Sequence, residues 1–261
     1  MTKRDTPWPE GTPNWADLMT KNREASWKFY RSVFGWEILD SGPDMGHYGM
    51  ATLGGRPVAG IGEPPAEAGN PPPAWTTYLA TDDVDKTVEA VQAAGGQVLM
   101  PPMDVGGAGR MAMAADPTGA VFGLWQAGEH IGTGLANEPG AMTWNELLTH
   151  DTAQAREFYT AVFGYRYTPV KGAADYTSID GEGPGGTVGG IGAMDNTPPA
   201  GKVQAHWLNY FAVTDTDATV KKVETSFGSV RVPPVDTPFG RMAVLADADG
   251  AEFAVIQSTG G

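Results

Sequence analysis

The stretch WADLMT at residues 15–20, followed by FYRSVFGW at residues 29–36, decides how this chain is organised. Both stretches return with the same spacing, as WNELLT at residues 144–149 and FYTAVFGY at residues 158–165. Further along, VAGIG at residues 58–62 matches VGGIG at 188–192, and GRMA at 109–112 matches GRMA at 240–243. A repeat over most of a chain indicates two copies of one structural unit. We therefore predict two homologous domains, at residues 1–130 and 137–261.

Each half divides again into two similar segments. A short strand at residues 15–20 leads to a helix that Asn22 is suited to cap, with apolar residues at helical spacing after it. Residues 83–94 repeat this helix pattern and end at Gly95-Gly96. Strand-like runs separated by Gly and Pro follow each helix. The sequence therefore predicts an α+β fold of four βαβββ modules, at about residues 10–64, 72–128, 140–194 and 204–259.

These motifs resemble those of the vicinal oxygen chelate superfamily, which includes glyoxalase I, bleomycin-resistance proteins and extradiol dioxygenases. The resemblance rests on four βαβββ modules, the pattern [ND]-x6-FY-x3-FG in each half, and a D-P-x-G turn before a last strand. TPNWADL at residues 12–18 and TWNELLT at 143–149 resemble two-domain glyoxalase-like proteins of actinobacteria, often labelled hydroxylases. Some of those relatives belong to antibiotic pathways or self-resistance. The resemblance implies two domains whose sheets curve around a cleft.

The resemblance also implies where a metal would be bound, and this chain lacks ligands there. The family's first ligand position, commonly His or Gln, falls on Trp15 and Trp144, and in the second modules on Thr76 and Leu208. The family's last-strand Glu falls on Gly123 and Ala254. An indole offers only an N–H donor, whereas a divalent metal needs several N or O ligands. We therefore predict no metal and no cofactor. A relocated metal site that uses Asp17, Glu146 and His206 is the competing hypothesis.

Side-chain alternation along a strand selects the candidate site residues. Asp17 and Glu146 lie two residues after Trp15 and Trp144, so they share a face with them and are candidate general bases in an apolar cleft. The alternative is that these acids satisfy backbone donors or pair with arginines. Candidate ligand-binding residues, aromatic or able to grip an oxygen, are Trp15, Tyr48, Tyr78, Arg110, Trp125, Trp144, Tyr176, His206, Tyr210 and Arg241. Several of these aromatic residues could instead fill the core, and the arginines could form structural salt bridges.

Composition limits the partners. The chain has 17 Lys plus Arg against 31 Asp plus Glu, and its net charge of −14 disfavours nucleic acid and anionic membrane surfaces. The absence of Cys excludes thiolate chemistry and disulfides. No apolar run approaches the roughly 20 residues of a membrane helix, and no signal peptide is evident. We expect a cytoplasmic protein with a small, aromatic ligand. The sequence does not decide whether the chain forms a homodimer.

Three functions follow from these patterns. The first is a metal-independent enzyme that acts on an aromatic or polyketide-like metabolite, as a hydroxylase-type or accessory enzyme of secondary metabolism. The second is a non-catalytic protein that binds or sequesters such a compound, as in resistance. The third is a metal-dependent lyase or dioxygenase. The glycine-rich residues 105–109 also suggest a mobile flap over the first cleft.

Overall fold

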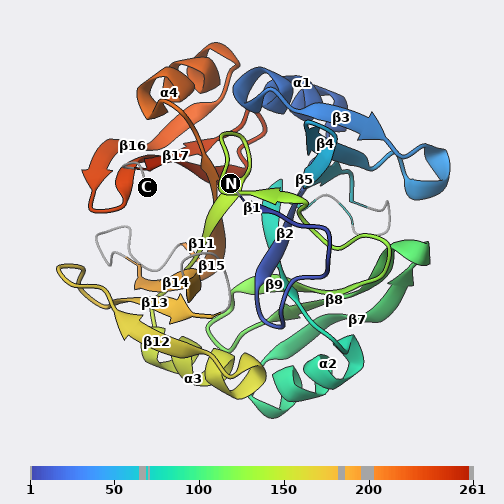
Figure 1. The fold of residues 1–261 in the computed structure, drawn as a ribbon, viewed down its shortest axis with the longest axis vertical. Coiled ribbons are helices and arrows are strands. Elements are labelled where there is room, and N and C mark those ends of the chain that lie inside the picture. The colour runs from blue at the N-terminus through green and yellow to red at the C-terminus, as the bar shows by residue number, and fades with distance from the viewer. Residues whose placement is uncertain (1, 65–68, 70, 182–185, 195–202, 259–261) are drawn as a thin grey trace.

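The computed structural model describes residues 2–64, 69, 71–181, 186–194 and 203–258, and it confirms the α+β fold of four βαβββ modules (Figure 1). Met1 and residues 259–261, at the outer ends of the two predicted domains, lie outside these ranges. The first half contains β2 (Pro13–Met19), α1 (Arg23–Phe34), β3 (Glu37–Asp40), β4 (Gly49–Leu53), β5 (Arg56–Gly62), β6 (Ala74–Ala80), α2 (Val84–Ala93), β7 (Gln97–Val105), β8 (Gly109–Ala115) and β9 (Val121–Ala127). The second half contains β11 (Met142–Thr149), α3 (Thr152–Phe163), β12 (Arg166–Pro169), β13 (Tyr176–Asp180), β14 (Thr187–Ala193), β15 (His206–Ala212), α4 (Thr216–Thr225), β16 (Ser229–Thr237), β17 (Gly240–Ala246) and β18 (Glu252–Ser258).

Each half forms one curved sheet of eight strands. The first sheet has the order β3-β4-β5-β2-β6-β9-β8-β7, and the second has the order β12-β13-β14-β11-β15-β18-β17-β16. The two modules of a half join where their first strands run antiparallel, β2 beside β6 and β11 beside β15. Modules therefore pair within a half, and the first strands occupy the centre of each sheet.

Sequence signals at the helix ends explain the [ND] and FG positions of the repeated motif. Asn22 caps α1 by accepting a hydrogen bond from the amide of Ala25, and Asp151 caps α3 by accepting one from Gln154. Gly35 ends α1 in the left-handed conformation, with a φ of 74°. The motif thus sets the length of the helix that crosses each sheet.

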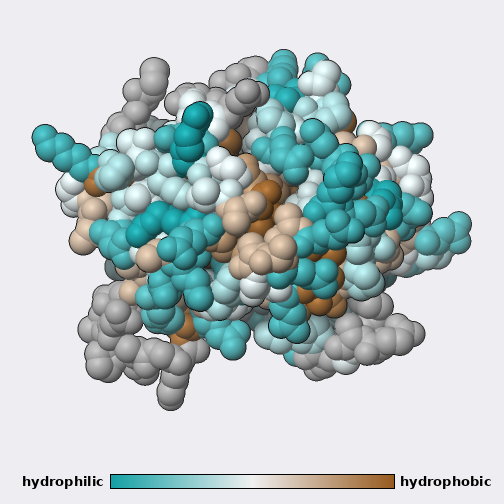
Figure 2. Space-filling model, turned by 90° about the horizontal axis from the view of Figure 1, so that it is seen from below, coloured by the Kyte–Doolittle hydropathy of each residue, from teal (hydrophilic) through white to brown (hydrophobic). Residues whose placement is uncertain are grey.

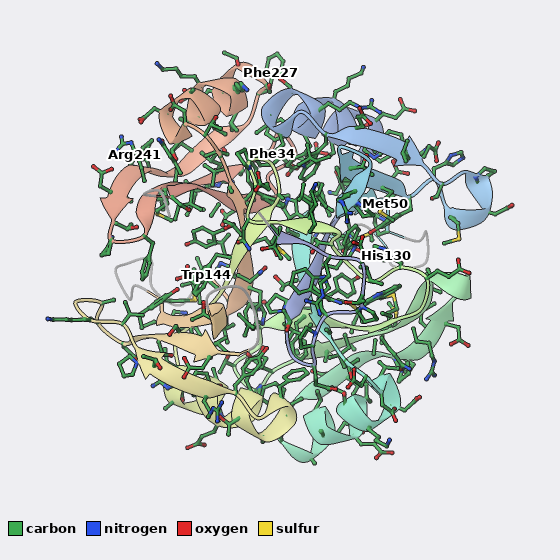
Figure 3. All side chains as sticks on the ribbon, viewed as in Figure 1. Phe34, Met50, His130, Trp144, Phe227 and Arg241 are labelled. Carbon is green, nitrogen blue, oxygen red and sulfur yellow. The ribbon has the colours of Figure 1, made fainter. Side chains whose placement is uncertain are left out.

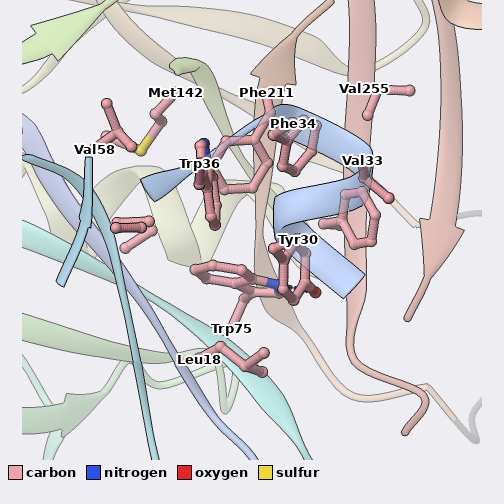
Figure 4. Packing of buried hydrophobic residues seen from close by; sticks show 14 of the residues in the cluster. Leu18, Tyr30, Val33, Phe34, Trp36, Val58, Trp75, Met142, Phe211 and Val255 are labelled. Carbon is pink, nitrogen blue, oxygen red and sulfur yellow. Dashed lines mark hydrogen bonds between the residues drawn. The ribbon is translucent and has the colours of Figure 1, made fainter. Parts of the chain in front are cut away.

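The helix-covered faces of the two sheets pack against each other. One core joins the first module to the fourth, with Tyr30, Trp36, Trp75 and Phe211 among its residues (Figure 4). A second core joins the second module to the third. Accordingly α1 lies beside α4, and α2 beside α3, at opposite ends of the molecule in Figure 1. The opposite, concave face of each sheet is therefore left for a cleft on the outside.

The connection between the halves crosses the first concave face. It includes β10 (Leu135–Ala136), which pairs with β1 (Thr2–Lys3). Before that, the amides of Glu129 and His130 donate to the carbonyls of Gly107 and Ala108 in the short 3-10 helix η3 (Gly106–Ala108). The predicted flap at residues 105–109 is hydrogen-bonded to this connection, and its mobility stays a prediction.

Hydrophilic residues cover most of the side of the molecule shown in Figure 2, with a smaller hydrophobic area near the middle. Among the residues whose structure is described, no helix is long and apolar enough to cross a membrane.

Candidate functional site

The two concave faces carry the same four-residue arrangement. The first quartet is Trp15, Asp17, Tyr48 and Tyr78, and the second quartet is Trp144, Glu146, Tyr176 and Tyr210. In each quartet the Trp and the acid lie two residues apart on a central strand. One Tyr sits opposite the Trp on the neighbouring central strand, in the pairs Trp15–Tyr78 and Trp144–Tyr210. All eight residues were predicted site residues, and the structure brings them together in two sets of four.

Hydrogen bonds connect the second quartet around its acid. The indole Nε1 of Trp144 donates to the hydroxyl of Tyr176 at 3.1 Å, and the hydroxyl of Tyr210 donates to Oε2 of Glu146 at 2.7 Å. Tyr176 also hydrogen bonds Glu146. Burial raises the pKa of Glu146, and the hydrogen bonds from the two phenols offset part of this rise. The second quartet therefore holds a carboxyl group whose pKa is closer to neutrality than that of an exposed Glu.

The first quartet repeats these contacts in a more buried setting. Trp15 Nε1 donates to the hydroxyl of Tyr48 at 3.1 Å, and Tyr78 donates to Oδ2 of Asp17 at 3.2 Å. The side chain of Asp17 is 5% exposed, and its Oδ1 is buried without a hydrogen-bond partner. Burial raises the pKa of Asp17 to about 7, although hydrogen bonds from both tyrosines lower it.

Glycines on the last strand of modules one and three make room for the tyrosines. A Cβ on Gly60 would lie 1.6 Å from the hydroxyl oxygen of Tyr48, and one on Gly190 would lie 2.2 Å from that of Tyr176. The VAGIG and VGGIG repeats are therefore part of the site, because they let a phenol reach the acid. Sequence reasoning found these repeats without assigning them this role, and the glycine at the centre of both repeats was the available signal.

The residues at the family's ligand positions do not fit a metal. Trp15 and Trp144 use their indole N–H groups within the quartets. A Cβ on Gly123 would lie 2.1 Å from the ring of Tyr78, so the phenol fills the space that a glutamate there would need. Ala254 is fully buried. In the described part of the chain, no three His, Asp or Glu side chains gather as a metal site would require.

The second cleft is open. It forms a cavity of about 680 Å³ that reaches from the second quartet to the hairpin between β16 and β17. Figure 3 shows Trp144 on the second sheet, across the molecule from Met50 on the first sheet and from His130 on the connection between the halves. The larger aromatic and apolar residues that line this cavity are Trp144, Tyr176, Tyr210, Phe239, Met242 and Ile256. Lining Ser and Thr residues include Thr143, Ser178, Thr187, Thr237 and Ser258. Such a space suits a ring system with few polar groups.

The first cleft is filled by the connection between the domains. The imidazole of His130 packs edge-on against Trp15, with ring centroids 4.4 Å apart, and lies 5.4 Å from the ring of Trp125. Trp125 Nε1 donates to the carbonyl of His130 at 2.8 Å. Trp15, Tyr78 and Trp125 are each at most 6% exposed. These predicted ligand-binding residues therefore pack as a core, and Asp17 beneath them does not face an open cavity.

Arg110 and Arg241, predicted to bind ligand, form ion pairs on the helix-covered faces of the sheets. Met111 packs on the concave cluster, so its neighbour Arg110 points to the opposite, helix-covered face. There Arg110 pairs with Asp85 and Asp104, and Arg241 likewise pairs with Asp217 and Asp236. Both arginines therefore form salt bridges, and their partners are not the quartet acids Asp17 and Glu146.

His206 lies at the rim of the second cleft. It is paired with Leu148 at the start of β15, and its Nδ1 is 2.9 Å from the carbonyl of Gln204. Its charged form weakly lowers the pKa of Glu146, so the predicted approach to Glu146 is electrostatic and not a direct contact.

The fold and the quartets define a two-domain protein of paired βαβββ modules. The model of the Glyoxalase/Bleomycin resistance protein/Dioxygenase superfamily matches residues 12–124 and 141–255, so the chain belongs to that superfamily. Among curated relatives, "Putative glyoxylase CFP32" of Mycobacterium tuberculosis (strain CDC 1551 / Oshkosh) is 46% identical over 98% of both chains. "Anthracycline biosynthesis protein DnrV" of Streptomyces peucetius is 38% identical over 97% of this chain and 95% of its own.

Solved structures show the same fold at low identity. The 2,3-dioxygenase LapB from Pseudomonas sp. KL28 aligns with a TM-score of 0.64 and 14% identity, over 95% of this chain and 93% of that one. The Mn(II)-bound glyoxalase from Novosphingobium aromaticivorans aligns with a TM-score of 0.63 and 14% identity, over 95% and 83%.

Proposed function

We propose that the second cleft binds an aromatic or polyketide-like small molecule and that Glu146 exchanges a proton with it, without a metal. The observation that carries this proposal is a cavity of about 680 Å³ with aromatic walls and one acid, held by two phenols. A cavity of this size matches the range of small-molecule sites. The chain would then act as a metal-independent, hydroxylase-type or accessory enzyme of secondary metabolism.

Glu146 has the properties of a general acid–base group. Its pKa is raised by burial, which favours proton exchange near neutral pH. Tyr210 and Tyr176 hold the carboxylate in place, so the group that meets the ligand is positioned before binding. The proposed proton transfer is between this carboxylate and an acidic O–H or C–H of the bound ring.

Similarity supports the ligand class. Relatives 38% and 39% identical to this chain are named as anthracycline biosynthesis proteins, and an anthracycline is a polycyclic aromatic compound. The quartet is built without a metal ligand at any of the family's positions, which supports a metal-independent role.

The test uses planar probes and matched acid variants. Anthraquinone and hydroxyanthraquinones should quench tryptophan fluorescence of the wild type, and quenching should persist after chelator treatment. Glu146→Gln should retain binding but lose at least 100-fold of any turnover of a hydroxyanthraquinone, since a general base contributes about 10²–10⁴-fold. Asp17→Asn, the matched change in the filled cleft, should keep that turnover. Stoichiometric zinc, nickel, manganese or iron in active protein would overturn the metal-independent proposal.

A binding protein that sequesters the compound is the second candidate. It is favoured by the fact that Glu146 is the only carboxyl, imidazole or amine group among the described lining residues, and binding alone needs no acid–base pair. Tight binding of probes that are recovered unchanged, in both wild type and Glu146→Gln, would select this function over catalysis.

A further inference from the structure

The second cleft has a negatively charged group but no positively charged group among its described lining residues. Of the described residues that line the cavity, Glu146 alone is charged, and none is Lys, Arg or His. We infer that the ligand carries no negative charge and meets Glu146 with a hydrogen-bond donor, either a hydroxyl on a neutral ring or a protonated amine. This inference rests on the proposed function, since it names the class of compound for the same cleft.

The donors of the second quartet are all used within it, so Glu146 can only accept a hydrogen bond from a ligand when its carboxyl group is ionised. The N–H of Trp144 is used on Tyr176, and the hydroxyls of Tyr210 and Tyr176 are both directed to Glu146. A Trp or Tyr side chain has one polar hydrogen, so these three donors are committed. The remaining lone pairs of the carboxylate can therefore accept a hydrogen bond from a donor on the ligand.

Two arginines of the second half are engaged outside the cavity, which leaves His206 at the rim and Lys171, between the lining residues Val170 and Ala173, as the nearby basic side chains. Arg241, on the strand that carries Met242, pairs with Asp217 and Asp236 on the other face of the sheet. Arg156 pairs with Asp175 beside the β12–β13 connection. An anionic ligand would thus face a buried carboxylate with no compensating charge from the lining described here, and like charges at short range in a low-dielectric site repel strongly.

The walls favour neutral and cationic ligands. Hydroxyls such as those of Ser178 and Thr187 can bind the oxygens of a neutral ring. The ring faces of Trp144 and Tyr210 attract a cation. The net charge of −14 on the chain also lowers the local concentration of anions around it.

Four anthraquinones that differ at one position test this inference. They carry 2-methyl, 2-hydroxymethyl, 2-aminomethyl or 2-carboxylate, and their affinities are measured at pH 7.5 by tryptophan quenching. The hydroxymethyl and aminomethyl probes should bind at least tenfold more tightly than the carboxylate, and the hydroxymethyl probe more tightly than the methyl one. Glu146→Gln should reduce the preference for amine over carboxylate at least fivefold. Asp17→Asn, which changes the buried acid of the filled cleft, should leave that preference unchanged.

The outcomes separate the two proposals. Equal or tighter binding of the carboxylate, or a preference that Glu146→Gln leaves intact, would overturn the inference while the aromatic cleft stands. Failure of all four probes to bind would refute the proposed function, and the inference with it.

Discussion

Asp17 and His130 are buried side by side with Trp15 in the first cleft, and their pKa shifts have opposite consequences. Burial raises the pKa of Asp17 to about 7 and lowers the pKa of His130 to about 4. Between pH 4 and 7 the folded state therefore keeps the proton on Asp17 that the unfolded state has lost. Over nearly the same range it rejects the proton on His130 that the unfolded state has gained. The two effects oppose each other.

Variants that remove one group at a time should show opposite dependences of stability on pH. In Asp17→Asn, His130 remains, so stability should rise from pH 4 to 6.5 by about 3 kcal/mol. In His130→Phe, Asp17 remains, so stability should fall from pH 4 to 7 by about 4 kcal/mol. Urea unfolding of both variants and the wild type at several pH values measures this. Parallel slopes in the two variants would contradict the assigned burial of these groups.

Phe227 is an exposed aromatic residue in a conformation that suits glycine. Its side chain is 88% exposed and its φ is 68°, whereas the matching position after α2 is Gly95, with a φ of 86°. Phe227→Gly should stabilise the protein by about 1 kcal/mol, because a side chain in the left-handed region costs about that much. Thermal unfolding measures the gain. Phe227→Ala keeps the Cβ, so a comparable gain in that control would attribute the effect to the lost ring instead.

The hairpins β7–β8 and β16–β17 occupy the same place in the two halves, but they make different contacts at the edge of their clefts. In the first half, η3 receives hydrogen bonds from the connection that carries His130. In the second half, the turn places Phe239, 55% exposed, at the cavity, and Thr237 holds the turn by donating to the carbonyl of Gly240 at 2.8 Å. Phe239 thus lies where a bound ring would give it a partner.

Phe239→Ala should weaken binding of 2-(hydroxymethyl)anthraquinone about tenfold, mainly through faster dissociation, because an aromatic contact contributes on the order of 1 kcal/mol beyond its buried area. Stopped-flow quenching measures both rates. Phe227→Ala is the matched control, since it removes another exposed Phe at the opposite end of β16. Unchanged dissociation in Phe239→Ala would show that the hairpin does not cover the ligand.

The repeated motifs predicted the modules, their order and the strand face of both quartets. Strand alternation alone placed Trp15 beside Asp17 and Trp144 beside Glu146, since it depends only on local geometry. It could not distinguish an open cleft from a filled one, because His130 reaches Trp15 from a connection more than a hundred residues away in sequence. Alternation also places Arg110 and Arg241 on the helix-covered face, opposite to Met111 and Met242. Their partners Asp85 and Asp217 lie on neighbouring helices, and the motif around each Arg does not include these partners.

Two tyrosines of the FY motif bind the halves to each other. Tyr30 donates to Asp247 of the other half at 3.0 Å, and Tyr159 donates to Asp116 at 3.2 Å. Each hydroxyl also accepts from an indole, that of Trp75 or Trp207. The turns that begin at Asp116 and Asp247 are therefore contacts between the halves as well as turns, and the shared cores should make the chain unfold as one unit.

Tyr30→Phe and Tyr159→Phe should each destabilise the protein by about 1–3 kcal/mol, since a buried carboxylate and an indole lose their partner. Tyr167→Phe, which removes a bond to a backbone carbonyl within the second half, serves as control and should cost less. Calorimetry gives the size and number of transitions. Two separate transitions in the wild type would contradict the shared core.

Among the described residues, the second cleft encloses a cavity, whereas the imidazole of His130 fills the first cleft. His130→Ala should lose about 3 kcal/mol of stability and leave a space between Trp15 and Trp125. Apolar cavities of this kind bind small aromatic molecules, so millimolar imidazole at pH 8 should raise the Tm of His130→Ala by several degrees. It should not raise that of wild type or of His206→Ala, which removes an imidazole at the rim of the open cleft. No rescue of His130→Ala would mean that the connection collapses into the space. In that case the two halves would differ through the path of the backbone, and His130 would not be what keeps the first cleft closed.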